Sequence, residues 1–119
     1  MLKAAICDDD KKFTDIIEYY VTKHYADCLE YTIHYSAEEL IAFEEAEQKS
    51  HDIYILDIEM GEMNGLELAQ KLRDKDEGIA IVFMSNHNYM PDSFYVRPHH
   101  YLMKPVTDYE DGKMAFLGG

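Results

Sequence analysis

Acidic, hydroxyl and ammonium side chains follow four short apolar segments of this sequence. Asp8 and Asp9 follow the first segment, and Asp57, Ser85 and Lys104 follow the other three. Short apolar runs bounded by polar residues predict strands buried on both faces. Because the carboxyl ends of parallel strands meet at one edge of a sheet, we expect these side chains to share a cleft. That cleft would contain three carboxylates, one hydroxyl and one ammonium group.

This set of side chains is suited to phosphoryl transfer. Three neighbouring carboxylates repel one another and stay ionised together only beside a cation. Mg²⁺ prefers one or two carboxylates together with waters and phosphate oxygens. Lys104 would supply a positive charge for a phosphoryl oxygen, and Ser85 a hydrogen-bond donor. With Asp57 as the nucleophile, the product would be an aspartyl phosphate.

Each of these residues also has an ordinary structural explanation when it is taken alone. A single Asp after a strand is usually a turn residue or a helix cap, and Lys-Pro is usually a turn. A Ser after a strand is commonly a cap. The combination favours a functional site, because four strands end in the complementary groups of one reaction.

The elements that must position this cleft are predicted from apolar periodicity and capping patterns. Apolar residues at helical spacing between residues 13 and 21 predict a helix of 13–15 residues. Ser36 with Glu39, and Asn64 with Glu67, have the pattern of capping boxes at the start of two more helices. The predicted strands are residues 2–7, 29–35, 53–56, 79–84 and 101–103, and the later helices are residues 37–49, 66–72 and 92–96.

Regular alternation of strands and helices predicts an α/β fold with a parallel sheet and helices on both of its faces. The sequence has no repeat and no linker, so we expect a single domain over residues 1–119. Thr107 and Glu110 begin a fifth helix, but Gly112 lies within it. We therefore expect the last helix to be short or incomplete.

Composition and charge exclude several classes of protein. Apolar residues make up 47% of the 119, which is enough for a packed core, and no apolar run approaches the length of a membrane span. The net charge is 11 − 24 = −13, which argues against direct contact with nucleic acid. The N-terminus does not resemble a signal peptide, and the two cysteines form no disulfide framework. These features predict a cytoplasmic protein with no membrane partner. The six histidines have no metal-site spacing, so we expect them at the surface or at the edge of the core.

In combination, the motifs resemble the receiver domain of two-component response regulators over residues 3–106. They are Ile-Cys-Asp-Asp at 6–9, Asp-Ile-Glu-Met at 57–60, Met-Asn-Gly at 63–65, Ser85, and Lys-Pro at 104–105. Residues 94–105 resemble receivers that precede LytTR-type DNA-binding domains. The resemblance implies a flavodoxin-like, doubly wound sheet of five parallel strands in the order 2-1-3-4-5. Gly61 departs from the family, which usually has a proline at this place.

The resemblance implies a metal-assisted phosphoacceptor. Asp57 would accept phosphate from the phosphohistidine of a sensor histidine kinase. Mg²⁺ would be ligated by Asp9, Asp57 and the backbone carbonyl of Glu59, with Asp8 acting mainly through water.

The resemblance also implies a switch around the acceptor. Ser85 and Lys104 would bind the phosphoryl group, and Tyr101 would turn inward behind Ser85. The bond before Pro105 would be cis. Two side chains would tune the lifetime of the phosphate: Glu59 and His87.

We expect the chain to be the N-terminal part of a longer transcriptional regulator whose C-terminal output domain binds DNA. Apolar residues at 114, 116 and 117 would allow a homodimer. The alternatives are a stand-alone receiver, an interaction module with a silent site, and a Mg²⁺-dependent phosphohydrolase that uses Asp57 as its nucleophile. Multiple turnovers on phosphate esters would distinguish the phosphohydrolase.

Overall fold

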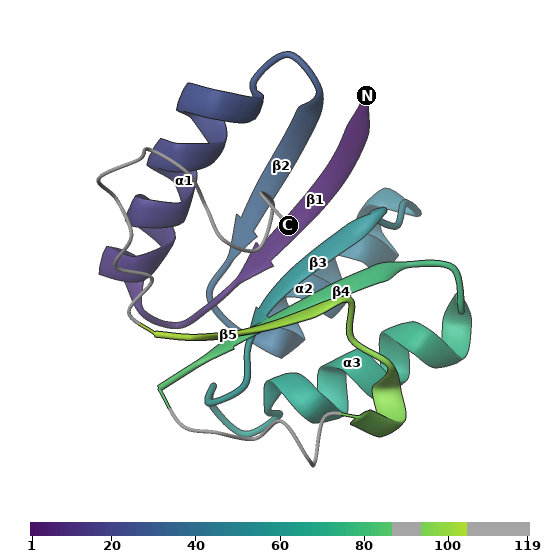
Figure 1. Cartoon of the computed structure of the whole chain (residues 1–119). Helices are drawn as coiled ribbons and strands as arrows, with labels where there is room; N and C mark the ends of the chain where they lie inside the picture. Colours follow the sequence, from purple (N-terminus) through teal and green to yellow (C-terminus); the bar gives the residue numbers. More distant parts are fainter. Residues whose placement is uncertain (87–93, 105–119) are drawn as a thin grey trace.

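The computed structural model describes residues 1–86 and 94–104 of the chain. The elements are, in order, β1 (Leu2–Cys7), α1 (Lys11–Tyr25), β2 (Leu29–His34), α2 (Ala37–Glu47), β3 (Ile53–Asp57), α3 (Gly65–Lys75), β4 (Ala80–Ser85), the 3₁₀ helix η1 (Phe94–Val96) and β5 (His100–Met103) (Figure 1). All five predicted strands are present, and the predicted alternation of strands and helices is confirmed.

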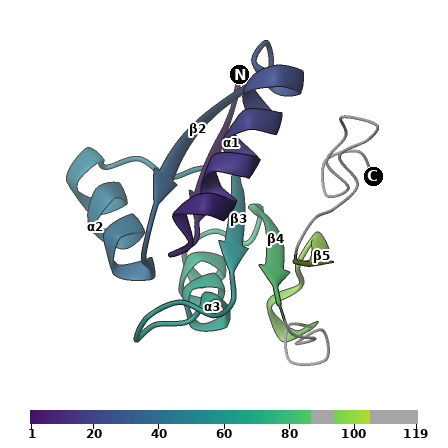
Figure 2. The same cartoon turned by 90° about the vertical axis from the view of Figure 1, so that its left-hand side faces the viewer.

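The five strands form one parallel sheet in the order β2-β1-β3-β4-β5, which confirms the predicted flavodoxin-like topology. The helix α1 covers one face of the sheet, whereas α2 and α3 cover the other (Figure 1). Figure 2 shows α1 and α2 on opposite sides of β2. This double cover explains why the central strands contain continuous apolar runs, at residues 4–7, 53–56 and 80–84, rather than an apolar residue at every second position.

Successive side chains of each central strand enter two separate cores. Ala4 and Ile6 of β1 pack on the α1 face with Ile17, whereas Ala5 and Cys7 pack on the α2 and α3 face. All five of these residues are fully buried. The alternation follows from the two-residue period of a strand.

Side-chain caps begin the helices as the sequence predicts. Asn64 and Glu67 form the complete, reciprocal capping box that was predicted. At the second helix, Ser36 accepts a hydrogen bond from the backbone N–H of Glu39, which is one of the two bonds of the predicted box. The sequence pattern missed the cap of α1, where Asp10 accepts from the backbone N–H groups of Lys12 and Phe13. These bonds satisfy backbone donors in the first helical turn, which have no partner within the helix.

Two predicted helix ends were wrong. The third helix does not stop where the polar residues begin at 73 but continues to Lys75, and Arg73 within it is buried. The second helix ends at Glu47, because Gln48 adopts a left-handed conformation with φ 53°. Of the helix predicted at residues 92–96, residues 94–96 are described and form η1. Residues 92 and 93, and the predicted fifth helix, lie outside the described ranges.

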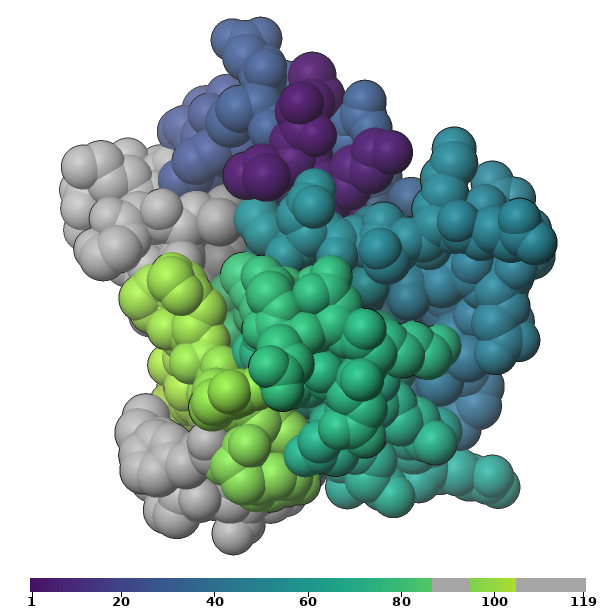
Figure 3. Space-filling view, turned by 90° about the vertical axis from the view of Figure 1, so that its right-hand side faces the viewer, coloured from purple at the N-terminus to yellow at the C-terminus, as the bar shows by residue number. Residues whose placement is uncertain are grey.

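The segment from η1 to β5 packs against the end of α3 and the start of β4, as the space-filling view shows (Figure 3). It leads directly to Lys104 at the carboxyl end of β5. The position of Lys104 therefore depends on contacts that are made near the amino ends of the strands, on the side of the sheet away from the acidic cluster. Within residues 1–86 and 94–104, no helix is both long and apolar enough to cross a membrane.

Candidate metal and phosphoryl-transfer site

Three carboxylates converge at the carboxyl edge of the sheet. Asp8 and Asp9 follow β1, and Asp57 ends β3, which pairs with β1 so that Cys7 lies beside Leu56. One carboxylate oxygen from each of Asp8, Asp9 and Asp57 lies within 4.8 Å of the other two. Asp8 is fully buried, Asp57 is 4% exposed, and Asp9 is exposed. The structure thus brings together the three predicted acidic residues, with one side of the cluster open to solvent.

Lys104 reaches this cluster from the end of β5. Its backbone N–H donates to the carbonyl of Ser85 across 2.7 Å, which continues the pairing of β5 with β4. Its ammonium nitrogen lies 2.5 Å from Asp8 Oδ2 and 3.5 Å from Asp57 Oδ1, and 4.3 Å from the centre of the Phe13 ring. The ammonium group is therefore positioned by two carboxylates and an aromatic face.

Burial makes these carboxylates costly to ionise together. Burial raises the pKa of Asp57, and the neighbouring charge of Asp8 raises it further, whereas Lys104 opposes the shift. Burial also raises the pKa of Asp8, although Lys104 and the backbone N–H of Asp10 act in the opposite direction. One ammonium group does not balance three carboxylates, so the site favours an additional cation.

The acidic cluster fits a magnesium ion. Asp8 Oδ2 is close to Lys104, but the contact is poorly aligned, and among the described residues this buried oxygen accepts no well-formed hydrogen bond. Asp9 and Asp57 offer hard oxygen donors beside it, and the exposed side of the cluster leaves room for water ligands. Oxygen ligands combined with open water positions are what Mg²⁺ requires.

Ser85 lies at the same edge, with its hydroxyl directed to another acid. It ends β4 and is fully buried, and its Oγ donates to Glu59 Oε1 across 3.2 Å. Glu59 is exposed on the loop after β3. Tyr101 is half-buried on β5, and its ring centre lies 6.4 Å from that of Phe83. The predicted site residues His87 and Pro105 lie outside the described residues.

A second polar cluster, which the sequence analysis missed, lies under α2. Thr32 Oγ1 contacts His34 Nε2 at 2.7 Å and His51 Nε2 at 2.9 Å, and His51 Nδ1 lies 2.7 Å from Glu44 Oε2. The hydroxyl of Tyr54 donates to the same Glu44 oxygen. His34 and His51 are 3% and 7% exposed, so of the predicted surface or core-edge positions these two do not have the surface one. His51 lines a cavity.

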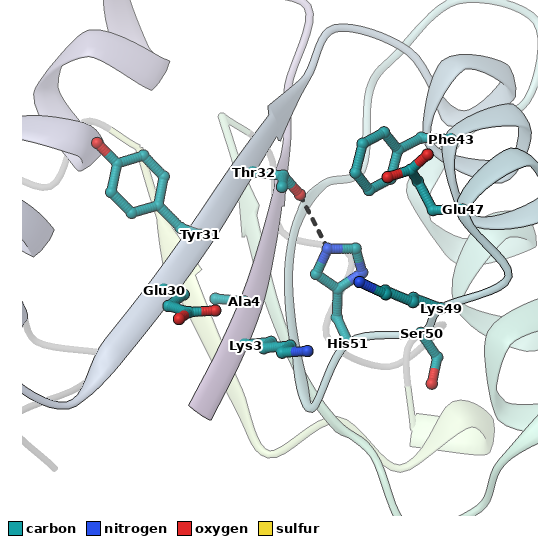
Figure 4. A pocket seen from close by; sticks show the side chains of 10 residues that line it. All are labelled: Lys3, Ala4, Glu30, Tyr31, Thr32, Phe43, Glu47, Lys49, Ser50 and His51. Carbon is teal, nitrogen blue, oxygen red and sulfur yellow. Dashed lines mark hydrogen bonds between the residues drawn. The ribbon is translucent and has the colours of Figure 1, made fainter. Parts of the chain in front are cut away.

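Thr32 and His51 line a cavity of about 190 Å³. Figure 4 shows their hydrogen-bonded side chains facing each other. The rest of the wall includes Lys3, Phe43 and Lys49. The cluster joins α2 to strands β2 and β3 through side-chain hydrogen bonds. No sequence motif marks it, because the hydrogen bonds that join its parts connect residues 7, 10 and 19 positions apart, which meet only in the fold.

Glu44→Gln should lower the free energy of unfolding by about 1–3 kcal/mol at pH 7, since it weakens two hydrogen bonds of a mostly buried carboxylate. Burial alone would raise the pKa of Glu44, but the bonds from His51 and Tyr54 hold it below its ordinary value of 4.5. A carboxylate whose pKa is lower in the folded state than in the unfolded state stabilises the protein at pH values above its unfolded-state pKa. This stabilisation is lost as the pH falls through its folded-state pKa. The difference between wild type and Glu44→Gln should therefore shrink below pH 4.5.

Urea denaturation between pH 7 and pH 3.5 measures this difference. Glu45→Gln is the matched control, because Glu45 is the next residue of α2 and is exposed. It should change the free energy of unfolding by less than about 0.5 kcal/mol. A Glu44→Gln effect that is constant with pH would contradict the assigned hydrogen bonds.

Comparisons with known proteins identify relatives that match most of the chain. The sensory transduction protein LytT of Bacillus cereus is 33% identical over 116 residues, and LytT of Bacillus anthracis is 32% identical. These matches cover 91% of this chain but 43% of the relatives, so the chain spans less than half of their length.

Solved structures of receiver domains superpose closely on the chain. A CheY-like receiver domain protein from Methanospirillum hungatei JF-1 has a TM-score of 0.76 at 23% identity, covering 89% of this chain and 83% of that one. The response regulator TrrA of Thermotoga maritima, solved in complex with Mg²⁺-BeF, has a TM-score of 0.70 at 26% identity, covering 92% of each chain.

The response regulator receiver domain family matches residues 4–111, which is most of the chain. The five-stranded parallel sheet and the acidic residues at its carboxyl edge agree with this match. The chain therefore belongs to the response regulator receiver domain family.

Proposed function

We propose that this receiver domain is a phosphorylation-dependent switch that accepts a phosphoryl group on Asp57 from the phosphohistidine of a sensor histidine kinase. One observation carries the proposal: a nearly buried Asp57 carboxylate lies between two further acids and a lysine ammonium group. The carboxylate is the nucleophile, and the ammonium group is close enough to contact a phosphoryl oxygen on it.

Each residue at the edge has a role in this proposal. Asp8, Asp9, Asp57 and the backbone carbonyl of Glu59 would hold Mg²⁺, which supplies charge neutralisation for the transferred phosphoryl group. Lys104 and Ser85 bind phosphoryl oxygens. The phosphorylated state then biases Ser85 and Tyr101 toward a second arrangement, and the surface around β5 changes with them. Pro105 and His87 keep their predicted roles as the cis-proline and a tuner of phosphate lifetime.

The relatives support the proposal in two respects. TrrA, at 26% identity, was solved with Mg²⁺-BeF, and an acidic site that holds such a complex is what the residues at this edge would form. The LytT relatives are more than twice as long as this chain. We propose that residues 1–119 are the N-terminal receiver of a cytoplasmic regulator and that a C-terminal output domain controls transcription by binding DNA.

The proposal is tested with acetyl phosphate and Mg²⁺. Wild-type protein should gain one phosphoryl group that is stable in acid and labile in base, measured as intact mass. Asp57→Asn should gain none, because its amide is not a nucleophile. Asp74→Asn, at an exposed position of α3, is the matched control and should behave as wild type.

Phosphate that persists in Asp57→Asn would overturn the assignment of Asp57. Repeated turnover of small phosphate esters at rates above spontaneous hydrolysis would instead identify a phosphohydrolase.

A further inference from the structure

The hydrogen bond between Ser85 and Glu59 joins two residues whose proposed roles are separate. Ser85 Oγ donates to Glu59 Oε1 across 3.2 Å, beside an Asp57 carboxylate that is 4% exposed. A serine hydroxyl carries one proton that it can donate. A bond to a charged carboxylate is also stronger than a bond between neutral groups. In this hydrogen bond, the Ser85 proton is therefore given to a strong acceptor.

We propose that Glu59 is a positioning residue that competes with the phosphoryl group on Asp57 for the hydroxyl of Ser85. The inference rests on the proposed function of Asp57 and Ser85 and specifies how their site is regulated. One donated proton cannot satisfy both acceptors, so Ser85 must leave Glu59 before it donates to a phosphoryl oxygen. Glu59 thereby stabilises the unphosphorylated arrangement and weakens the affinity of the site for phosphoryl groups.

The surroundings of Glu59 allow this exchange. Its side chain is exposed and lines a surface hollow of about 300 Å³ together with Gly61 and Asn64. Gly61 adopts a φ of +34° and has no neighbouring atom within 4 Å of the position of a Cβ. A carboxylate released from Ser85 has room to move and regains water, whereas Ser85 stays buried at the end of β4.

Loss of the competing acceptor should strengthen phosphoryl binding. Before the phosphoryl group binds, the hydrogen bond between Ser85 and the charged Glu59 must break, and the carboxylate regains water in return. The net cost corresponds to about five- to tenfold in affinity. The probe is beryllofluoride with Mg²⁺, a stable mimic of the phosphoryl group, with affinity measured by isothermal titration calorimetry. Glu59→Ala should bind it about five- to tenfold more tightly than wild type.

A double-mutant cycle separates competition from simple charge repulsion. Repulsion between Glu59 and the bound anion does not require Ser85, but competition does. The affinity gain of Glu59→Ala should therefore be at least about threefold smaller in a Ser85→Ala background. Glu59→Gln keeps an oxygen acceptor but removes the charge, so it should gain less affinity than Glu59→Ala. If Ser85→Ala does not fold, Ser85→Cys, a much weaker donor, takes its place.

A second measurement uses the protein without metal or beryllofluoride. Urea unfolding of the same four proteins should show coupling between Glu59 and Ser85, because a hydrogen bond joins their side chains in the fold. Equal affinity gains with and without Ser85, or no coupling in the free protein, would overturn the competition. If wild type accepts no phosphate and binds no beryllofluoride, the proposed function is wrong, and the proposed competition is wrong with it. Coupling between Glu59 and Ser85 in unfolding would then show that their hydrogen bond is purely structural.

Discussion

Gly65→Ala is expected to lower the free energy of unfolding by about 3 kcal/mol, the upper part of the usual range for overpacking. A Cβ at this position would lie 2.3 Å from the carbonyl oxygen of Asp57 and 2.8 Å from the Cα of Ile58. Both are backbone atoms, so neither can move aside by rotating a side chain. Helix propensity alone would favour Ala over Gly by roughly 1 kcal/mol. A large decrease in the free energy of unfolding would therefore indicate the clash with the backbone of residues 57 and 58.

The same methyl group should also impair the acidic site. It would press on the peptide of Asp57, the residue whose carboxylate meets those of Asp8 and Asp9. We expect Gly65→Ala to take up phosphate from acetyl phosphate at least tenfold more slowly than wild type, because transfer depends on accurate positioning. Urea denaturation and intact-mass measurements test the two effects.

Gly78→Ala is the control for this substitution. Its Cβ would lie 3.3 Å from Asp76 Oδ1, an exposed side-chain atom that can move. The free energy of unfolding should change by less than about 1 kcal/mol. Similar losses at positions 65 and 78 would contradict the assigned clash and indicate a general intolerance of the chain to added methyl groups.

Arg73→Met is expected to destabilise the protein by about 4 kcal/mol, from roughly 1 kcal/mol for each hydrogen bond that is lost. Arg73 is 6% exposed, and its guanidinium group donates to four backbone carbonyls of the described chain. The acceptors are Val96, Glu77, Ile79 and Arg97. Met fills a similar volume but donates no hydrogen bond, so the carbonyls that stay buried lose their donor.

Arg73 connects two parts of the chain that are distant in sequence. It ties the end of α3 to η1 and to the residue after it, which lead into β5 and Lys104. Arg73→Met should therefore also weaken binding of beryllofluoride, in addition to lowering the urea midpoint. Arg73→Lys should recover part of the stability, since Lys keeps a charge and three donors.

Arg97→Met is the matched control. The Arg97 side chain is 63% exposed, and its contact with Glu77 is long, at 3.9 Å. An exposed ion pair of this kind contributes less than about 1 kcal/mol. A loss at Arg97 as large as that at Arg73 would contradict the assignment of the stabilisation to the four carbonyl bonds.

The parts of the fold that could be predicted from the sequence depend on local patterns. Apolar runs identified all five strands, and the Asn64–Glu67 pattern identified a helix start that has both predicted hydrogen bonds. The ends of α2 and α3 were less predictable. Polar residues at 73–78 are typical of a loop, but Arg73 is held in the helix by carbonyls that lie up to 24 residues away.

The sequence by itself determined which side chains meet at the acidic edge. Asp57 and Ser85 end their strands, and Asp8 and Lys104 directly follow theirs. Parallel pairing brings these strand ends together whatever lies between them. Short apolar runs and a parallel sheet were sufficient for this prediction, because it needs only the direction of each strand.

Only the tertiary structure decided which of these groups contact one another. Lys104 lies nearer to Asp8 than to Asp57, and Ser85 donates to Glu59 rather than to the proposed phosphoacceptor. The Glu44–His51–Thr32 cluster and the four carbonyls around Arg73 likewise became visible only in the fold. Hydrogen bonds and ion pairs form only over distances of about 2.5–4 Å. A strand pattern places a side chain at an edge of the sheet, but it does not fix the distance between that side chain and a partner that is distant in the sequence.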